Sequence, residues 1–98
     1  TSVAINIDNY DRVVDTAQSG SLLLAAPTGT ASEGQELIYT ITAASGTISL
    51  TYNSIFVAST NIPVLPTGTA ATTYRTIKMK FIYNQRSGKW FIVAKDTW

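Results

Sequence analysis

The sequence predicts an all-β fold, a small antiparallel β-sandwich or a jelly-roll-like barrel of about seven or eight strands. Short segments alternate apolar and polar residues with the period of a half-buried strand. Threonine and β-branched residues dominate, which lowers helix propensity and suits a pleated surface. Turn residues separate the segments at short intervals, as in small sandwiches and barrels.

The clearest element is a hairpin in the last quarter of the chain. One face of its first strand, residues 76–83, is apolar and consists of Ile77, Met79, Phe81 and Tyr83. The other face carries Thr76, Lys78 and Lys80. A polar link over 84–88 contains a glycine, and in the second strand Trp90, Ile92 and Ala94 share a face. Two such runs across a short loop predict an antiparallel hairpin, and we expect the core to be built on it.

Four strands are expected before the middle of the chain. The first alternates over 3–7, and the second spans 10–16 with Val13 or Val14 inward. The third spans 21–26 with one apolar stripe and with Leu23 on the opposite face. Proline, glycine and small polar residues predict a loop over 27–34. Residues 35–43 alternate again, with Leu37, Tyr39, Ile41 and Ala43 inward.

The middle of the chain is less regular. Ser45-Gly46 predicts a turn, 47–51 a short strand, and 53–58 an irregular apolar piece. Residues 59–73 hold two prolines, a glycine and many threonines and alanines. We expect this segment to run over the surface, not to pack.

Composition limits the function classes. The 98 residues are 45% hydrophobic and 13% charged, which predicts a single globular all-β domain over 1–98. The chain has no histidine and no cysteine, so zinc sites and thiol nucleophiles of the usual kinds are excluded. No apolar run approaches the roughly 20 residues that span a bilayer, and no leader pattern opens the chain. We therefore expect no cofactor and no membrane partner.

The net charge of +1 conceals an uneven distribution. Five carboxylates lie in the first half, and the last quarter holds most of the cations. Basic residues on strands can keep sheet edges soluble, which is the reading we favour. A nucleic-acid surface would need them clustered beside stacking aromatics, but the alternation turns Tyr83 inward and Lys78 and Lys80 outward, so no nucleic-acid partner is expected. Complementary acidic and basic faces between identical subunits remain a third reading.

Particular residues resemble a known domain. The stretch Ala26-Pro27-Thr28-Gly29-Thr30 with Glu33-Gly34-Gln35-Glu36-Leu37-Ile38 is similar to a small domain common in tailed-bacteriophage virion proteins. So are Leu50-Thr51-Tyr52-Asn53, Ile62-Pro63-Val64-Leu65-Pro66-Thr67 and the closing hairpin from Phe81 to Ala94. The similarity spans residues 10–98. It implies a C-terminal domain of a tail fibre, tailspike or capsid-associated protein, a virion location and assembly as a homotrimer.

Four apolar residues lie opposite the inward stripes of their strands: Leu23, Ile82, Phe91 and Val93. Exposed apolar residues that cluster indicate an interface, so we expect these four to form a self-association surface. The alternative is that a loop, such as 59–73, folds over them. Leu23, Phe91 and Trp98 also depart from the resembling domain, where polar or small residues are expected outside the core.

Other constellations favour structural readings. Trp90 could stack on a sugar, but its stripe with Ile92 favours a core anchor. Asp8, Asp11 and Asp15 lack the spacing of a calcium loop. Glu33 and Glu36 lack the cleft that a glycosidase needs, so no catalytic residues are expected.

The sequence therefore predicts a non-catalytic structural module of a phage virion, a fibre cap or a capsid decoration, which acts by self-association and contacts other virion proteins. The alternative is a carbohydrate- or receptor-binding module at a fibre tip. Its ligand surface, which could take a host-surface glycan, would comprise Tyr52, Tyr74, Trp98 and the segment 59–73.

Overall fold

A computed structural model describes residues 2–68 and 75–98. These residues form eight strands and no helix. The described part of the chain therefore contains no helix that could span a membrane. The strands are β1 (Ser2–Val3), β2 (Arg12–Gln18), β3 (Ser21–Leu24), β4 (Glu36–Ala43), β5 (Ser49–Tyr52), β6 (Phe56–Val57), β7 (Thr76–Asn84) and β8 (Lys89–Thr97).

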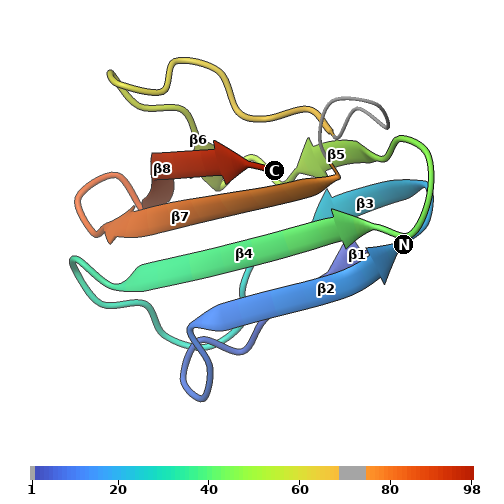
Figure 1. Cartoon of the computed structure of the whole chain (residues 1–98). Coiled ribbons are helices and arrows are strands. Elements are labelled where there is room, and N and C mark those ends of the chain that lie inside the picture. The colour runs from blue at the N-terminus through green and yellow to red at the C-terminus, as the bar shows by residue number, and fades with distance from the viewer. Residues whose placement is uncertain (1, 69–74) are drawn as a thin grey trace.

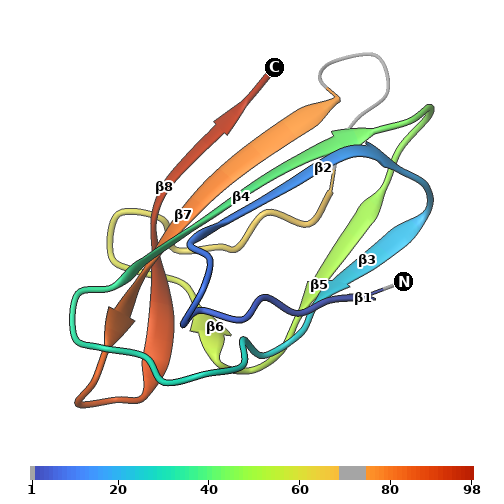
Figure 2. The same ribbon diagram turned by 90° about the horizontal axis from the view of Figure 1, so that it is seen from below.

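The strands form two layers. A five-stranded sheet has the order β2-β4-β7-β8-β6, and a three-stranded sheet has the order β1-β3-β5 (Figure 1). In the turned view the two sheets are seen as separate layers, with β2, β4, β7 and β8 in one and β1, β3 and β5 in the other (Figure 2). The prediction of an all-β sandwich is confirmed.

The strand directions are mixed, whereas an antiparallel sandwich was expected. Only β4–β7 and β7–β8 pair antiparallel; β1–β3, β3–β5, β2–β4 and β6–β8 pair parallel. The cause is the path of the chain, because β1 to β5 alternate between the two sheets. Each connection reverses direction and crosses to the other layer, so strands that meet in one sheet run the same way.

The core consists of the inward stripes that the sequence predicts. Leu22 and Leu24 of β3 are buried, as are the four inward residues of β4. The β7–β8 hairpin supplies the largest share, with Ile77, Met79, Phe81, Trp90 and Ile92 all at most 1% exposed. Phe81 packs against Phe56 with ring centroids 4.9 Å apart, and Tyr39 meets both rings edge-on. The hairpin is therefore confirmed as the centre of the core.

A β-bulge in β8 changes the faces of its second half. Phe81 pairs with Ile92 but Lys80 pairs with Ala94, so Val93 is an extra residue on β8. Ala94 therefore lies on the outward face with Lys80, and the expectation that it shares a face with Trp90 and Ile92 is wrong. The strand bends visibly along its length in Figure 2.

The first part of the segment 59–73 packs against the core, and the prediction of a surface excursion is wrong for it. Ile62 is buried and Leu65 packs against the core cluster. The Leu50 amide donates a hydrogen bond to the Thr67 carbonyl at 2.8 Å, so the segment extends along the free edge of β5. It thereby lies at the side of the sandwich between β5 and β8, with a pocket left between residues 64–68 and the end of β8. The rest of the segment, 69–73, lies outside the described residues.

Candidate interaction surface

The outward side of the five-stranded sheet, called the outer face below, is the larger of the two outward sheet faces. Residues that pair across strands share a face, so the register places its side chains in four rows. The rows are given in order toward the end of β8. The first row is Glu36, Ile82, Phe91 and Val57, and the second is Arg12, Ile38, Lys80 and Ala94. The third row is Val14, Thr40, Lys78 and Asp96, and the fourth is Thr42, Thr76 and Trp98.

Apart from Glu36, the first row forms an apolar end of the outer face. Ile82 lies directly opposite Phe91, and Phe91 lies opposite Val57 on its other side. All three side chains are partly buried by their neighbours in the sheet. Val93, at the bulge, follows on β8 and is 42% exposed. Ile82, Phe91 and Val93 are thus brought to the same end of one sheet.

Leu23 lies elsewhere. It sits on the outward side of the three-stranded sheet, between Ser2 and Thr51, and is 38% exposed. Leu22 and Leu24 beside it point into the core, so Leu23 faces away from the outer face. The expectation of one surface made of all four residues is therefore wrong for Leu23.

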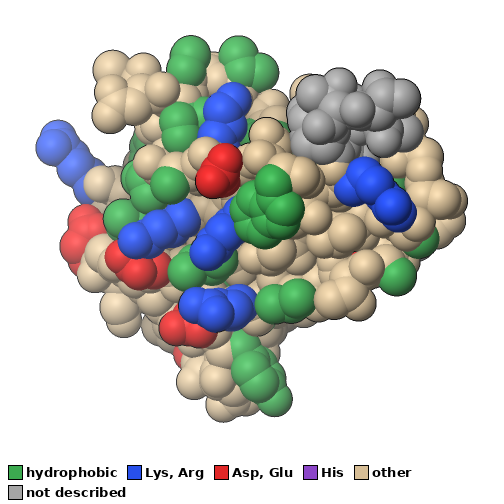
Figure 3. Space-filling view, in the orientation of Figure 1, with side chains coloured by type: hydrophobic (Ala, Val, Ile, Leu, Met, Phe, Trp, Pro, Cys, Tyr) green, Lys and Arg blue, Asp and Glu red, His purple; other side chains and the backbone are tan. Residues whose placement is uncertain are grey.

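Charged side chains occupy the middle of the outer face. Lys80 forms an ion pair with Glu36 at 2.9 Å, and Lys78 lies opposite Asp96 on β8. Basic and acidic side chains are interspersed over these strands in Figure 3. Ile38 and Ala94 lie among them and, with Lys78, Lys80, Lys95 and Asp96, line a hollow of about 440 Å³. The Lys95 side chain itself faces the inward side, because Lys95 pairs with the buried Met79.

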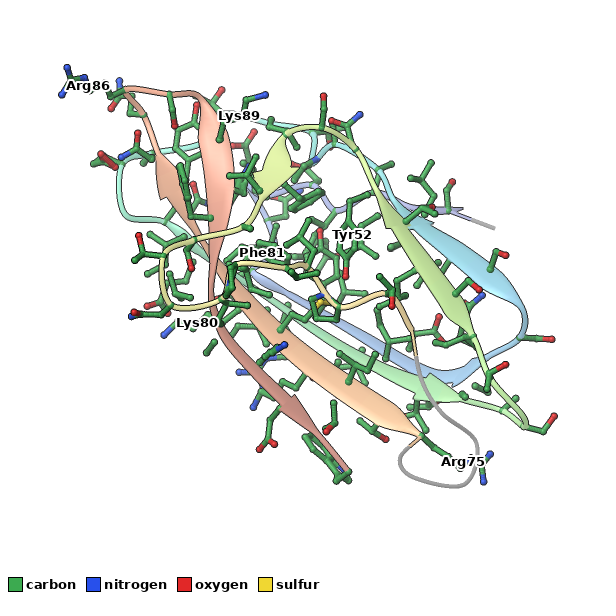
Figure 4. The ribbon with its side chains drawn as sticks, turned by 90° about the horizontal axis from the view of Figure 1, so that it is seen from above. Tyr52, Arg75, Lys80, Phe81, Arg86 and Lys89 are labelled. Carbon is green, nitrogen blue, oxygen red and sulfur yellow. The ribbon has the colours of Figure 1, made fainter. Side chains whose placement is uncertain are left out.

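The basic residues do not form a single cluster. Arg86 points away from the molecule at the tip of the β7–β8 hairpin, far from Lys80 on the outer face (Figure 4). Arg75 binds the carbonyls of Ala43 and Ala44 at the opposite end of the hairpin. Lys78 and Lys80 lie on β7, an interior strand, so the expectation that the cations protect sheet edges is wrong for these two.

Of the two described aromatic residues expected on a ligand surface, Trp98 is exposed and Tyr52 is partly buried. Trp98 is 59% exposed, and its backbone exchanges hydrogen bonds with Thr76, which fixes the position of the backbone. Tyr52 instead points between the sheets (Figure 4). The Tyr52 hydroxyl donates to the Pro66 carbonyl at 2.5 Å, and desolvation by burial raises the pKa of this group above its ordinary value. Placing Tyr52 on a ligand surface was therefore wrong, and Tyr74 lies outside the described residues.

The other candidate residues have structural partners. Trp90 is 1% exposed and packs against Tyr83, with ring centroids 5.1 Å apart, so it is a core anchor. Asp8 accepts a hydrogen bond from the Thr30 amide, and Asp15 accepts one from the Ala17 amide. The described residues contain no group of three or more His, Cys, Asp or Glu that could hold a metal ion.

Sequence reasoning missed two parts of this surface. Val57 fell in a segment expected to be irregular, and only its pairing with Phe91 places it on the outer face. The hollow over Ala94 depends on the bulge at Val93, for which the alternating sequence gave no signal. Comparison of the chain with family models, with curated proteins and with solved structures finds no match.

Proposed function

We propose that this chain is a non-catalytic structural module of a bacteriophage virion and that it assembles as a homotrimer through the apolar end of the outer face. The observation that carries the proposal is the row of Ile82, Phe91 and Val57 on the outward side of a sheet. In a monomer the part of this row that its neighbours leave uncovered stays in contact with water, whereas a second copy would remove it from water.

The size of the outer face supports this choice of surface. Four strands about 4.8 Å apart and about eight residues long cover about 500 Å². A stable interface buries about 800 Å² per partner, so the face supplies more than half of the required area and neighbouring loops would have to supply the rest. The three-stranded sheet, with shorter strands, covers at most about 200 Å². Leu23 alone on that small face is therefore a weaker centre for an interface than Phe91.

The virion role and the trimer are supported by the resemblance of residues 26–38 and 81–94 to the phage virion domain. In a closed three-fold ring every subunit makes the same contacts, so the apolar end would lie around the symmetry axis. Burial is worth about 25 cal/mol per Å² of apolar surface, so the apolar end can contribute several kcal/mol before association entropy is subtracted.

Solution mass tests the proposal. Light scattering on a sizing column should give a trimer for the wild type and a monomer for Phe91→Ser, because the substitution places a hydroxyl at the centre of the apolar row. Leu23→Ser is the matched control, since it makes a similar change on the opposite face and should leave the trimer intact. A wild-type monomer at high protein concentration would refute self-association of this chain.

Cross-linking tests which surface forms the contact between two copies of the chain. The chain has no cysteine, so any disulfide between copies must come from an introduced residue. Phe91→Cys should give covalent dimers under mild oxidation, because Phe91 lies at the centre of the proposed contact. Leu23→Cys should give far fewer. Equal yields from both variants would contradict the assignment of the interface to the outer face.

A second candidate function is carbohydrate binding, and Trp98 is the observation that favours it. The side chain of Trp98 is exposed, its backbone pairs with Thr76, and it lies on the same face as the hollow over Ala94. Aromatic side chains with one apolar face exposed are suited to pack against sugar rings. Glycan binding that Trp98→Ala abolishes, with the oligomer unchanged, would establish this function. The same binding by wild type and Trp98→Ala would exclude Trp98 as the platform.

A further inference from the structure

We propose that the hollow over Ala94 binds a neutral sugar, whose hydroxyl groups are held between Lys78 and Asp96. The inference rests on the second candidate function, carbohydrate binding, and adds the site and the chemical class of the ligand. Three observations carry it: the shape of the hollow, the balance of the charges around it and the position of Trp98.

The shape of the hollow follows from the bulge in β8. The extra residue Val93 turns Ala94 onto the outer face beside Lys80, so a methyl group stands among longer side chains. Ala94 and Ile38 supply the apolar part of the lining. At about 440 Å³ the hollow lies in the range of small-molecule sites, about 300–1,000 Å³.

The charges around the hollow balance one another. Lys80 forms an ion pair with Glu36 at 2.9 Å, and Lys78 lies opposite Asp96 across β7 and β8. Lys95 also lines the hollow, but its side chain faces the inward side of the sheet. The outward charges at the hollow are therefore two lysines and two carboxylates. An anionic ligand would be attracted by Lys78 and repelled by Asp96, so the arrangement favours a neutral ligand.

Lys78 and Asp96 offer complementary hydrogen-bonding groups. They are neighbours in the register, yet among the described residues they form no ion pair with each other. The Thr97 amide donates to one Asp96 oxygen at 2.8 Å, which leaves the second oxygen as an acceptor. A lysine ammonium only donates and an ionised carboxylate only accepts, whereas a sugar hydroxyl does both. Two adjacent hydroxyls of one ring can therefore accept from Lys78 and donate to Asp96, and such hydrogen bonds to charged groups are the stronger ones.

Trp98 extends the site in one direction. It is 59% exposed and follows Asp96 by two residues on the same face, about 7 Å further along β8. An exposed aromatic ring beside polar groups suits the apolar C–H face of a sugar ring. A sugar ring between Lys78 and Asp96 thus brings the next ring of an oligosaccharide toward Trp98.

Other ligand classes fit the hollow less well. A purely apolar ligand would cover Lys78 and Asp96 without replacing the hydrogen bonds that water makes to them. Single-stranded nucleic acids are bound by positively charged grooves with several stacking aromatics. Here the charges balance, and among the aromatic side chains in the rows of the outer face only Trp98 is more than half exposed.

Tryptophan fluorescence tests the proposal. The chain has two tryptophans, of which Trp90 is 1% exposed and Trp98 is 59% exposed, so a sugar on the outer face should change the emission of Trp98. We titrate the intact chain with three neutral trisaccharides, cellotriose, maltotriose and mannotriose, and expect a saturable change with at least one that salt does not weaken. No saturable binding of any of the three, in fluorescence and in calorimetry, would overturn the proposal.

Substitutions of the charged residues locate the site. Lys78→Gln and Asp96→Asn should each weaken binding of the neutral trisaccharide about tenfold, the effect of one hydrogen bond to a charged group. Lys89→Gln is the matched control, because Lys89 donates to the Ser54 carbonyl and does not line the hollow. Equal effects of all three substitutions would overturn the site.

Ala94→Leu tests the shape of the hollow without changing any charge. The larger side chain should fill the hollow and abolish binding, and Ala94 is exposed, so the fold should tolerate it. Ala17→Leu is the matched control, because Ala17 is an exposed strand residue that does not line the hollow. Unchanged binding by Ala94→Leu would overturn the hollow as the site.

The outcomes separate this inference from the functions proposed above. Sugar binding that Trp98→Ala abolishes and Ala94→Leu leaves unchanged would keep carbohydrate binding and overturn the hollow. Tighter, salt-sensitive binding of trigalacturonate, an acidic trisaccharide, would keep carbohydrate binding and overturn the neutral class. Binding of a neutral trisaccharide in the hollow by a monomeric wild type would refute self-association and support this inference.

Discussion

At the scale of single residues, the most unusual group is the hydroxyl of Tyr39. The side chain is fully buried and its ring contacts Phe56 and Phe81 edge-on, yet among the described residues its hydroxyl has no hydrogen-bond partner. A buried polar group without a partner costs about 1–3 kcal/mol. Desolvation by burial also raises the pKa of Tyr39 above its ordinary value of 10.0. The aromatic ring of Tyr39 therefore stabilises the folded state, whereas its buried hydroxyl lowers the stability of that state.

Tyr39→Phe should accordingly leave the free energy of unfolding unchanged or raise it by about 1 kcal/mol. Tyr52→Phe is the matched comparison and should lower it by about 1 kcal/mol, because it removes the hydrogen bond to Pro66. Urea unfolding at neutral pH measures both. A clear loss of stability in Tyr39→Phe would show that its hydroxyl has a partner.

The same two tyrosines, Tyr39 and Tyr52, should make the folded state less stable at alkaline pH. Their pKa values are higher in the folded state than the ordinary 10.0, so the unfolded state loses protons first. Their contribution is full below about pH 10 and declines as the pH rises above it. Stability should fall less steeply above that pH in Tyr39→Phe than in the wild type.

At the scale of elements, the segment 59–68 shows where composition misleads. Proline, glycine and threonine indicate irregular backbone correctly, but they do not decide whether the segment is buried. Here the apolar residues decide, because Ile62 and Leu65 fill the gap between the sheets. Gly68 belongs to the same fit, since a Cβ there would collide with the Ile48 carbonyl.

Ile62→Ala should therefore lower the free energy of unfolding by about 2–4 kcal/mol, as expected for a buried isoleucine. Val64→Ala, in the same segment, should change it by less than about 0.5 kcal/mol, because Val64 is 65% exposed. Thermal unfolding of the two variants gives the comparison. Equal, small effects of the two substitutions would show that Ile62 is not packed in the core and that the segment lies on the surface.

At the scale of the whole molecule, the sequence determines which residues face inward better than it determines the topology. The alternation correctly predicts the buried stripes of β3, β4 and β7, because side-chain direction has a period of two. It carries no information on strand direction, which depends on whether a turn leads to a neighbouring strand or to the other sheet. The alternation therefore predicted correctly that Leu23 and Phe91 point outward, but it could not predict that they lie on different sheets.

The two long free edges of the large sheet carry the same pair of protective features. In β2, Asp15 pairs with the buried Ile41 and so points to the inward side, next to a register shift before Gln18. In the second half of β8, Lys95 pairs with the buried Met79 and follows the bulge at Val93. Inward charges and bulges discourage edge-to-edge pairing. These features would keep the edges from competing with the proposed association through the outer face.

This arrangement predicts a specific aggregation-prone variant. Asp15→Val replaces the inward charge on the β2 edge by a β-branched apolar residue, so we expect turbidity and loss of soluble protein on warming, with little loss of folding stability. Asp11→Val is the matched control, because it removes the same charge from the turn that precedes β2. If both variants stay equally soluble, the edge charge has no protective role. If both aggregate equally, net charge and not edge geometry keeps the molecules apart.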